Sequence, residues 1–161
     1  MTMNKIAIIG SSGSGKSYLA EGLGNHYDLP VIDLDDVILD ENYEKPPLDV
    51  YRERVRAEAE KDHWIIEGVY PKVGDIVWTS ADAVVWLNLP FDAIRKRYEE
   101  RDLERQRSGP FPDVEIHKKE YARLNRVYPE MLGELPVENV VEVTDPEYTI
   151  DDIASQLEGE L

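Results

Sequence analysis

Short apolar runs alternate with amphipathic segments along most of the chain. Runs of apolar, mostly β-branched residues predict buried strands, at 6–9, 30–33, 64–66, 83–87 and 140–143. Between them, apolar residues recur at helical spacing and predict helices, over about 16–26, 49–61, 91–105, 121–131 and 150–157. Strands that alternate with helices favour an α/β fold, in which helices cover both faces of a parallel sheet.

Two of the predicted helices carry specific boundary signals. Thr149 and Asp152 are placed for an N-cap and a capping-box-like return contact at the start of the last helix. Pro129 lies inside the apolar pattern of 121–131, so we expect that helix to be kinked or broken there. The chain has 161 residues without a visible repeat or linker, so we expect a single domain over 1–161.

A glycine-rich loop after the first predicted strand matches the Walker A pattern in full. It reads Gly10-Ser11-Ser12-Gly13-Ser14-Gly15-Lys16-Ser17. Backbone N–H groups of such a loop surround phosphates, Lys16 reaches the β and γ oxygens, and Ser17 ligates Mg²⁺. This loop, with Tyr18 beside it, is the predicted binding site for ATP and Mg²⁺. The alternative is a glycine-serine loop that only caps a helix.

Composition limits the other functions that the chain can have. The formal net charge of -16 repels polyanions, so we do not expect a nucleic-acid partner. Such acidity also fits adaptation to high salt. Without cysteine there is no disulfide framework or cysteine zinc site. No segment is apolar enough for a signal peptide or a membrane span, so we expect a cytoplasmic protein, monomeric or a small homo-oligomer.

Acidic residues follow the second and third predicted strands. Asp33-Leu34-Asp35 ends the second strand and Glu67 closes the third. In a parallel sheet these strand ends share one edge with the phosphate loop, so Glu67 stands where a Walker B acid would orient Mg²⁺. Two alternatives remain open. Glu67 could be a strand-end residue that bonds a nearby backbone N–H, and 33–35 could be a solvated acidic turn that caps the next helix, since Asp36 and Asp40 continue the acidic run.

Three arginines share one face of the predicted helix over 91–105. Arg97, Arg101 and Arg105 recur at four-residue spacing, and like charges at this spacing cost roughly 0.2–0.5 kcal/mol per pair. A bound anion would remove that cost. Alternatively, Glu100 and Glu104 neutralise the arginines in an ordinary surface network.

These features together resemble the adenylate-kinase-like P-loop kinases, and most closely the small topology-modulation proteins. The resemblance covers most of the first 110 residues and rests on three segments, Ile8 to Ser17, Ile32-Asp33-Leu34-Asp35-Asp36 and Trp64-Ile65-Ile66-Glu67-Gly68-Val69-Tyr70. It implies a three-layer P-loop NTPase fold with a five-stranded parallel sheet in the order 2-3-1-4-5. It also implies an acceptor-binding segment at about 35–62, a small lid at about 102–120, and phosphoryl transfer from ATP to a small acceptor.

The resemblance also implies roles for residues near the acceptor. Shikimate and gluconate kinases look similar at the second strand end, which would make Asp33 the metal-side residue and Asp35 the acceptor-side residue. Gly68 would allow the acceptor to approach the backbone closely. Arg52 and Arg54, on the acceptor-binding helix, are weaker candidates for holding an anionic acceptor.

Two further sites are implied on the nucleotide side. Arg97 and Arg101 resemble the arginine pair at the start of the adenylate-kinase lid, which stabilises charge on the transferring phosphoryl group. Thr144-Asp145-Pro146 falls where the resembled kinases wrap the adenine, so Asp145 and Pro146 are predicted to contact ATP.

The leading hypothesis is therefore an ATP- and Mg²⁺-dependent kinase of a nucleotide, nucleoside or hydroxylated metabolite. Its rivals are an ATP-binding regulatory module without a dedicated acceptor and a modulator of DNA topology.

Overall fold

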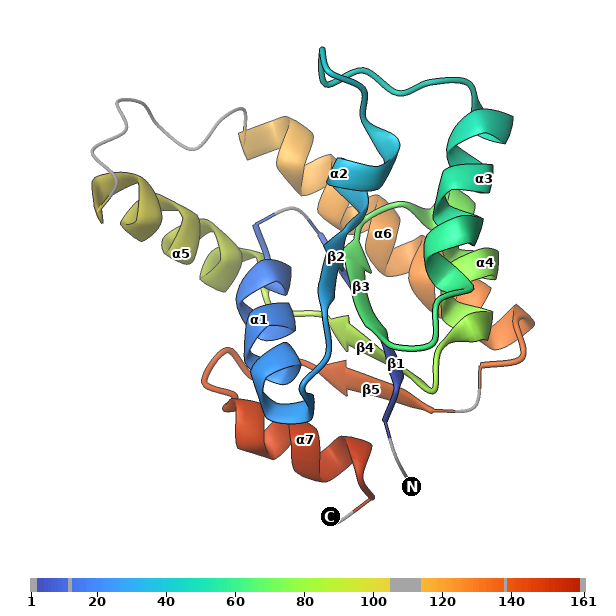
Figure 1. The fold of residues 1–161 in the computed structure, drawn as a ribbon. Coiled ribbons are helices and arrows are strands. Elements are labelled where there is room, and N and C mark those ends of the chain that lie inside the picture. The colour runs from blue at the N-terminus through green and yellow to red at the C-terminus, as the bar shows by residue number, and fades with distance from the viewer. Residues whose placement is uncertain (1–2, 12, 105–113, 138, 160–161) are drawn as a thin grey trace.

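The computed structural model describes residues 3–11, 13–104, 114–137 and 139–159 of the chain. It contains a five-stranded parallel sheet with strand order β2-β3-β1-β4-β5 (Figure 1), so the predicted α/β fold and strand order are confirmed. The strands are β1 (Lys5–Gly10), β2 (Val31–Asp33), β3 (Trp64–Gly68), β4 (Ala83–Leu87) and β5 (Val140–Val143). Because β1 lies between β3 and β4, the loop that follows β1 opens at the middle of the sheet's carboxyl edge.

Helices cover both faces of the sheet, which gives three layers (Figure 1). One face packs against α1, α7 and the start of α5, and the other packs against α3, α4 and α6. The helices are α1 (Lys16–Tyr27), α2 (Leu34–Ile38), α3 (Leu48–Ala59), the 3₁₀ turn η1 (Pro71–Val73), α4 (Gly74–Ser80), α5 (Phe91–Glu104), α6 (Val114–Glu134) and α7 (Ile150–Leu157).

The central strand β1 is held on both faces by apolar side chains. Ala7 and Ile9 belong to the core under α3, α4 and α6, whereas Ile6 and Ile8 belong to the core under α1 and α7. Burial of one such isoleucine is worth about 1.5–3 kcal/mol. The packing on both sides therefore fixes the end of β1, and with it the start of the phosphate loop.

The predicted capping box of α7 is confirmed. The N–H of Asp152 donates to the Thr149 hydroxyl over 3.1 Å, and the N–H of Thr149 donates to the Asp152 carboxylate over 3.3 Å. Both bonds satisfy amides that the helix itself leaves unpaired at its start.

Of the kink or break expected at Pro129, the break is wrong, because α6 runs from Val114 to Glu134 with the proline inside it. A proline inside a helix costs roughly 3 kcal/mol through one lost hydrogen bond and a steric clash. Leu124 and Tyr128 are almost fully buried on the N-terminal side of the proline, and Met131 packs against the same core on its C-terminal side. Tertiary packing on both sides of Pro129 thus outweighs the local penalty.

Candidate active site

The phosphate loop leaves β1 at Gly10 and enters α1. Gly13 and Gly15 have φ angles of 78° and 93°, a backbone region that residues with a Cβ rarely adopt. A Cβ on Gly10 would lie 2.9 Å from the carbonyl oxygen of Leu87 on β4. The backbone path therefore requires glycine at these three positions. Ser12 of the predicted loop lies outside the described residues.

Lys16 and Ser17 start α1 and point their polar atoms toward the loop and the neighbouring strand end. Lys16 Nζ donates to the carbonyl oxygen of Ser11 over 2.9 Å. Burial lowers the pKa of Lys16, and the negative charges of Glu67 and Asp35 oppose this effect. Ser17 Oγ donates to Glu67 Oε1 over 3.2 Å. The loop and the acidic strand ends are therefore one continuous site.

Two buried or half-buried carboxyl groups lie side by side at the ends of β2 and β3. Asp33 and Glu67 are register partners on these strands. Burial raises the pKa of Glu67 to about 7; the positive charge of Lys16 opposes the shift, and the charge of Asp33 adds to it. The pKa of Asp33 is raised as well, mainly by burial, although the N–H of Asp35 donates to its carboxylate over 2.8 Å. Asp33 thus caps α2, as the acidic-turn interpretation expected, while it also lies beside Glu67.

The oxygen atoms at this point fit a magnesium ion that is bound together with a nucleotide. Among the described residues, no group of three or more histidine or acidic side chains could hold a metal alone. Mg²⁺ is usually held by one or two carboxylates together with waters and substrate phosphates. Ser17, Asp33 and Glu67 supply such a set of hard oxygen donors. A divalent cation here would also relieve the repulsion between the two carboxylates.

The raised pKa of Glu67 makes the stability of the metal-free protein depend on pH. The folded state holds the Glu67 proton more tightly than the unfolded state, so this group costs stability progressively as pH rises from about 4.5 to about 7. Glu67→Gln removes that titration. In EDTA at pH 8 we expect the variant to melt higher than the parent by on the order of 5 °C, with little difference at pH 5.

Melting curves of parent and variant between pH 5 and pH 8 test this prediction. Glu53→Gln is the matched control, because Glu53 is exposed on α3 and forms its ion pair with Arg56, over 3.3 Å, at the surface. A Glu67→Gln melting difference that is the same at every pH would contradict the titration.

A cavity of about 680 Å³ adjoins the phosphate loop. It is lined by Gly13, Gly15, Lys16, Ser17, Tyr18, Glu21, Arg97, Glu100, Pro146, Glu147 and Tyr148. Arg97 crosses it: its Nη2 donates to the carbonyl oxygen of Pro146, and its guanidinium lies 5.9 Å from the centre of the Tyr148 ring. The cavity therefore joins the loop, α5 and the segment after β5, and its size suits the base and sugar of a nucleotide.

Asp35, which is predicted to contact the acceptor, is held by Tyr70. Tyr70 follows β3, and its hydroxyl donates to Asp35 Oδ1. Burial raises the pKa of Tyr70, and the hydrogen bond to Asp35 adds to the shift. Gly68 has a packing role, since a Cβ there would lie 2.7 Å from Leu34 Cδ1. The close approach that the sequence suggested at Gly68 is thus made by α2 in this structure.

Comparison with known proteins gives matches only among solved structures: a scan of protein-family models and a search of curated proteins found none. Shikimate kinase from Acinetobacter baumannii in complex with shikimate is similar with a TM-score of 0.65 and 15% identity, over 99% of this chain and 95% of that one. The YorR protein from Bacillus subtilis, in complex with phosphorylated GDP, is similar at 0.64 and 17%, over 97% and 95%. A gluconokinase from Sinorhizobium meliloti 1021 is similar at 0.60 and 18%, over 97% and 90%.

The chain has the fold of the small P-loop kinases. The similarity covers nearly the whole of this chain and nearly the whole of each of the three matched proteins. The five-stranded sheet, whose edge carries Asp33, Glu67 and the loop after β1, is therefore part of the shared fold.

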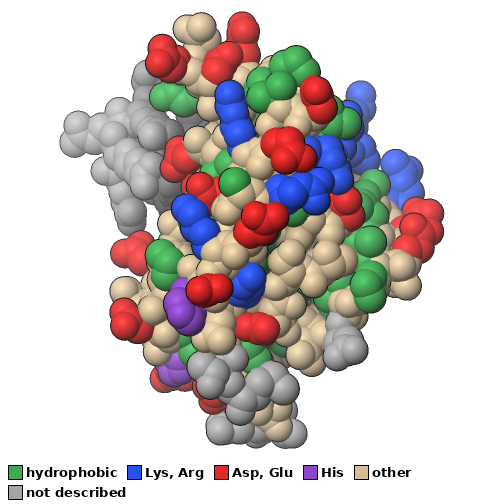
Figure 2. Space-filling model, turned by 45° about the vertical axis from the view of Figure 1, so that its right-hand side comes forward, with side chains coloured by type: hydrophobic (Ala, Val, Ile, Leu, Met, Phe, Trp, Pro, Cys, Tyr) green, Lys and Arg blue, Asp and Glu red, His purple; other side chains and the backbone are tan. Residues whose placement is uncertain are grey.

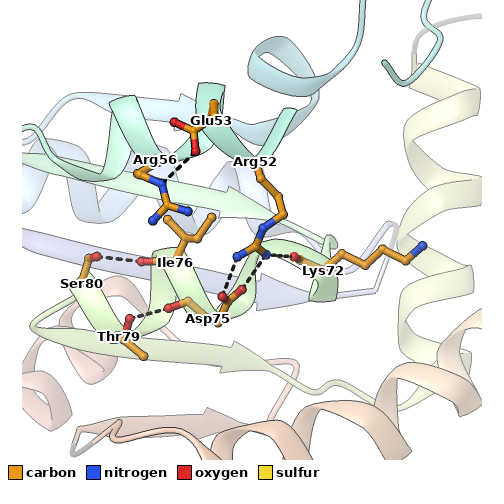
Figure 3. Close-up of polar contacts among 8 residues, drawn as sticks. All are labelled: Arg52, Glu53, Arg56, Lys72, Asp75, Ile76, Thr79 and Ser80. Atoms are coloured by element: carbon orange, nitrogen blue, oxygen red, sulfur yellow. Dashed lines mark hydrogen bonds and ion pairs between the residues drawn. The ribbon is translucent and has the colours of Figure 1, made fainter. Parts of the chain in front are cut away.

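Arg52, a predicted acceptor ligand, forms an ion pair with Asp75 in this structure. Its guanidinium forms two parallel bonds to the Asp75 carboxylate, of 2.9 and 2.7 Å, and donates to the carbonyl oxygen of Lys72 over 2.5 Å (Figure 3). These bonds hold the pKa of Asp75 below its usual range. They tie α3 to η1 and α4, and the acceptor role of Arg52 stays a prediction. Arg54 is exposed on α3, and its acceptor role also stays a prediction.

The predicted lid is described only in part. Arg97 lies within 3.7 Å of the position that a Cβ on Gly15 would take, so it adjoins the phosphate loop. The backbone of α5 includes Arg101, one helical turn further along. Arg105 and the rest of 105–113 lie outside the described residues, as does the side chain of Arg101.

Several cavity residues were not predicted from the sequence. Glu21, Glu100, Glu147 and Tyr148 line the cavity, whereas the Asp145 carboxylate accepts the N–H of Glu147 over 2.9 Å and shapes the turn there. Glu21 and Glu100 carry no motif and reach the cavity only because α1 and α5 meet at it. Tyr148 could have been found, since it lies two residues beyond the segment predicted to wrap the adenine.

The surface around α3 and α4 presents mixed charge. On this face, Lys and Arg side chains are interleaved with Asp and Glu side chains (Figure 2). The pair of Arg52 and Asp75 and the pair of Arg56 and Glu53 are examples of this interleaving. Within the described ranges, no helix has the length and apolar character needed to cross a membrane.

Proposed function

We propose that the chain is a kinase that transfers the γ-phosphoryl group of ATP to a hydroxyl group of a small acceptor. The observation that supports this most is the carboxylate of Asp35, which accepts a bond from the Tyr70 hydroxyl at the same sheet edge as Lys16 and Glu67. A carboxylate that can hold an O–H group beside a phosphate loop is what phosphoryl transfer to a hydroxyl needs.

In this proposal each residue of the loop and the strand ends has one task. The loop amides and Lys16 bind the β- and γ-phosphates, with phosphate oxygens replacing the Ser11 carbonyl as the partner of Lys16 Nζ. Asp35 orients the acceptor hydroxyl and takes its proton as the new O–P bond forms and the bond to the β-phosphate breaks. Arg97 and Arg101 stabilise the charge of the transferring group.

The proposed magnesium site consists of the oxygen donors at the start of α1 and at the ends of β2 and β3. Ser17, Asp33 and Glu67 would hold it together with the phosphates, and when bound it neutralises charge on the β- and γ-phosphates. Tyr18, which is 68% exposed at the cavity rim, together with Pro146 and Tyr148, would enclose the base.

Among the small P-loop kinases, we propose the topology-modulation proteins as the nearest group. The segments 32–36 and 64–70 support this, because they carry both acidic strand ends together with Tyr70 in the same order. A cytoplasmic location accompanies this proposal, and the net charge of -16 argues against direct binding to DNA.

A transfer assay tests the proposed function against an ATP-binding regulatory module. The protein is incubated with Mg²⁺ and ATP and with separate pools of nucleoside monophosphates, nucleosides, sugars, polyols and hydroxy acids, and new phosphate esters are read by ³¹P NMR. A new ester with at least one pool, lost in Lys16→Ala, supports the kinase. Tight ATP binding without a new ester in any pool would favour the regulatory module.

A further inference from the structure

Tyr70 makes a contact that packing does not require. It is half-buried, stands between β3 and η1, and donates its hydroxyl to the exposed carboxylate of Asp35. Lys45, from the loop between α2 and α3, lies with its Nζ 5.1 Å from the centre of the Tyr70 ring. The ring thus contacts Lys45, while its hydroxyl reaches the carboxylate that the proposed reaction uses.

The hydroxyl of Tyr70 and the hydroxyl of an acceptor are equivalent partners for Asp35. Both present one O–H donor to a carboxylate oxygen. A hydrogen bond near solvent is worth little net free energy, because water can replace either partner. The contact is therefore strong enough to be occupied in the free protein and weak enough to be exchanged for an acceptor hydroxyl.

Resting on the proposed kinase function, we propose that Tyr70 occupies the acceptor-hydroxyl position at Asp35 until an acceptor displaces it. While Tyr70 is in place, its hydroxyl competes with water for Asp35 Oδ1 and so restrains wasteful hydrolysis of ATP. An acceptor must supply a hydroxyl that competes for the same oxygen. Tyr70 is then a positioning residue that selects for hydroxyl-bearing acceptors over water.

Hydrolysis of ATP without an acceptor is the direct test, since water is then the competing hydroxyl donor. In Tyr70→Phe the ring and its Lys45 contact remain, but the hydroxyl that holds Asp35 is gone. We expect the rate of phosphate release from Mg-ATP to rise by about two- to tenfold, which is the factor by which one ordinary hydrogen bond changes an equilibrium constant. The KM for ATP should stay within the error of the measurement, because Tyr70 is not among the residues that line the nucleotide cavity.

Tyr121→Phe is the matched control. Its hydroxyl donates to the carbonyl oxygen of Leu89 over 2.8 Å, so the variant loses one tyrosine hydrogen bond away from Asp35 and should hydrolyse ATP at the parent rate. Measurable hydrolysis that is equal or slower in Tyr70→Phe than in the parent overturns the role of Tyr70 and leaves the kinase proposal standing. ATP turnover by neither the parent nor any variant, with or without acceptor pools, overturns both.

Discussion

Lys16→Ala is expected to lower kcat for ATP turnover by roughly 10³-fold, because it removes the positive group that, in the proposed reaction, stabilises the transferring phosphoryl. ATP binding should weaken as well, by roughly 10- to 100-fold, the equivalent of one hydrogen bond to a charged group. The fold should remain intact, since Lys16 Nζ donates to a carbonyl oxygen of its own loop. Calorimetric titration with ATP, turnover rates and circular dichroism measure the three effects.

Lys61→Ala is the control for removing a lysine. Lys61 is exposed and pairs with Glu58 over 2.6 Å at the end of α3, and a surface pair of this kind contributes little. We expect its ATP affinity and turnover to equal those of the parent. ATP affinity and turnover that are unchanged in Lys16→Ala would remove the nucleotide site from the proposal.

The phosphate loop was predictable because its signals are local. Gly13 and Gly15 occupy the backbone region that favours glycine, and both lie between a buried strand and a helix that the apolar pattern also predicts. The capping box of Thr149 and Asp152 is local in the same way. Strand order followed from the resemblance that these segments carry, and not from the apolar runs, which specify strands but not their neighbours.

The sequence failed where tertiary contacts decide the local structure. The elements α2, η1 and α4 have five, three and seven residues, too few to show a helical period. The local effect of Pro129 predicts a kink or a break in the helix, but the core contacts of Tyr128 and Met131 keep α6 continuous.

Side-chain roles were hardest to predict where the partner is distant in sequence. Arg52 finds its carboxylate at Asp75, 23 residues away, and no pattern in the sequence connects the two. The contact of Arg97 with Pro146 spans 49 residues. The positions of the acidic residues could therefore be predicted from residue type and from the ends of the strands. The partners of the arginines could be identified only from the tertiary structure.

Arg101→Ala is expected to lower kcat for phosphoryl transfer by roughly 10²-fold, while the ATP dissociation constant changes by only a few-fold. An arginine of the lid acts on charge that develops during transfer, so its loss affects the transition state more than bound ATP. Arg97 differs, because it bonds the Pro146 carbonyl and lies over Tyr148 in the cavity beside the phosphate loop, where the proposal places the base of ATP. For Arg97→Ala we therefore expect a lower kcat together with a clearly raised KM for ATP.

Arg95→Ala, on the same helix, is the matched control for both arginine variants. Arg95 is exposed and pairs with Glu99 over 3.1 Å within α5, so its removal takes one arginine from the helix without touching the cavity. Its kcat and KM should equal those of the parent, with at most a small loss of thermal stability. If Arg101→Ala behaved like Arg95→Ala, losing a little stability at unchanged kcat, the arginines after β4 would form a surface network. The proposed transfer would then rely on Lys16 and the strand-end donors for its positive charge.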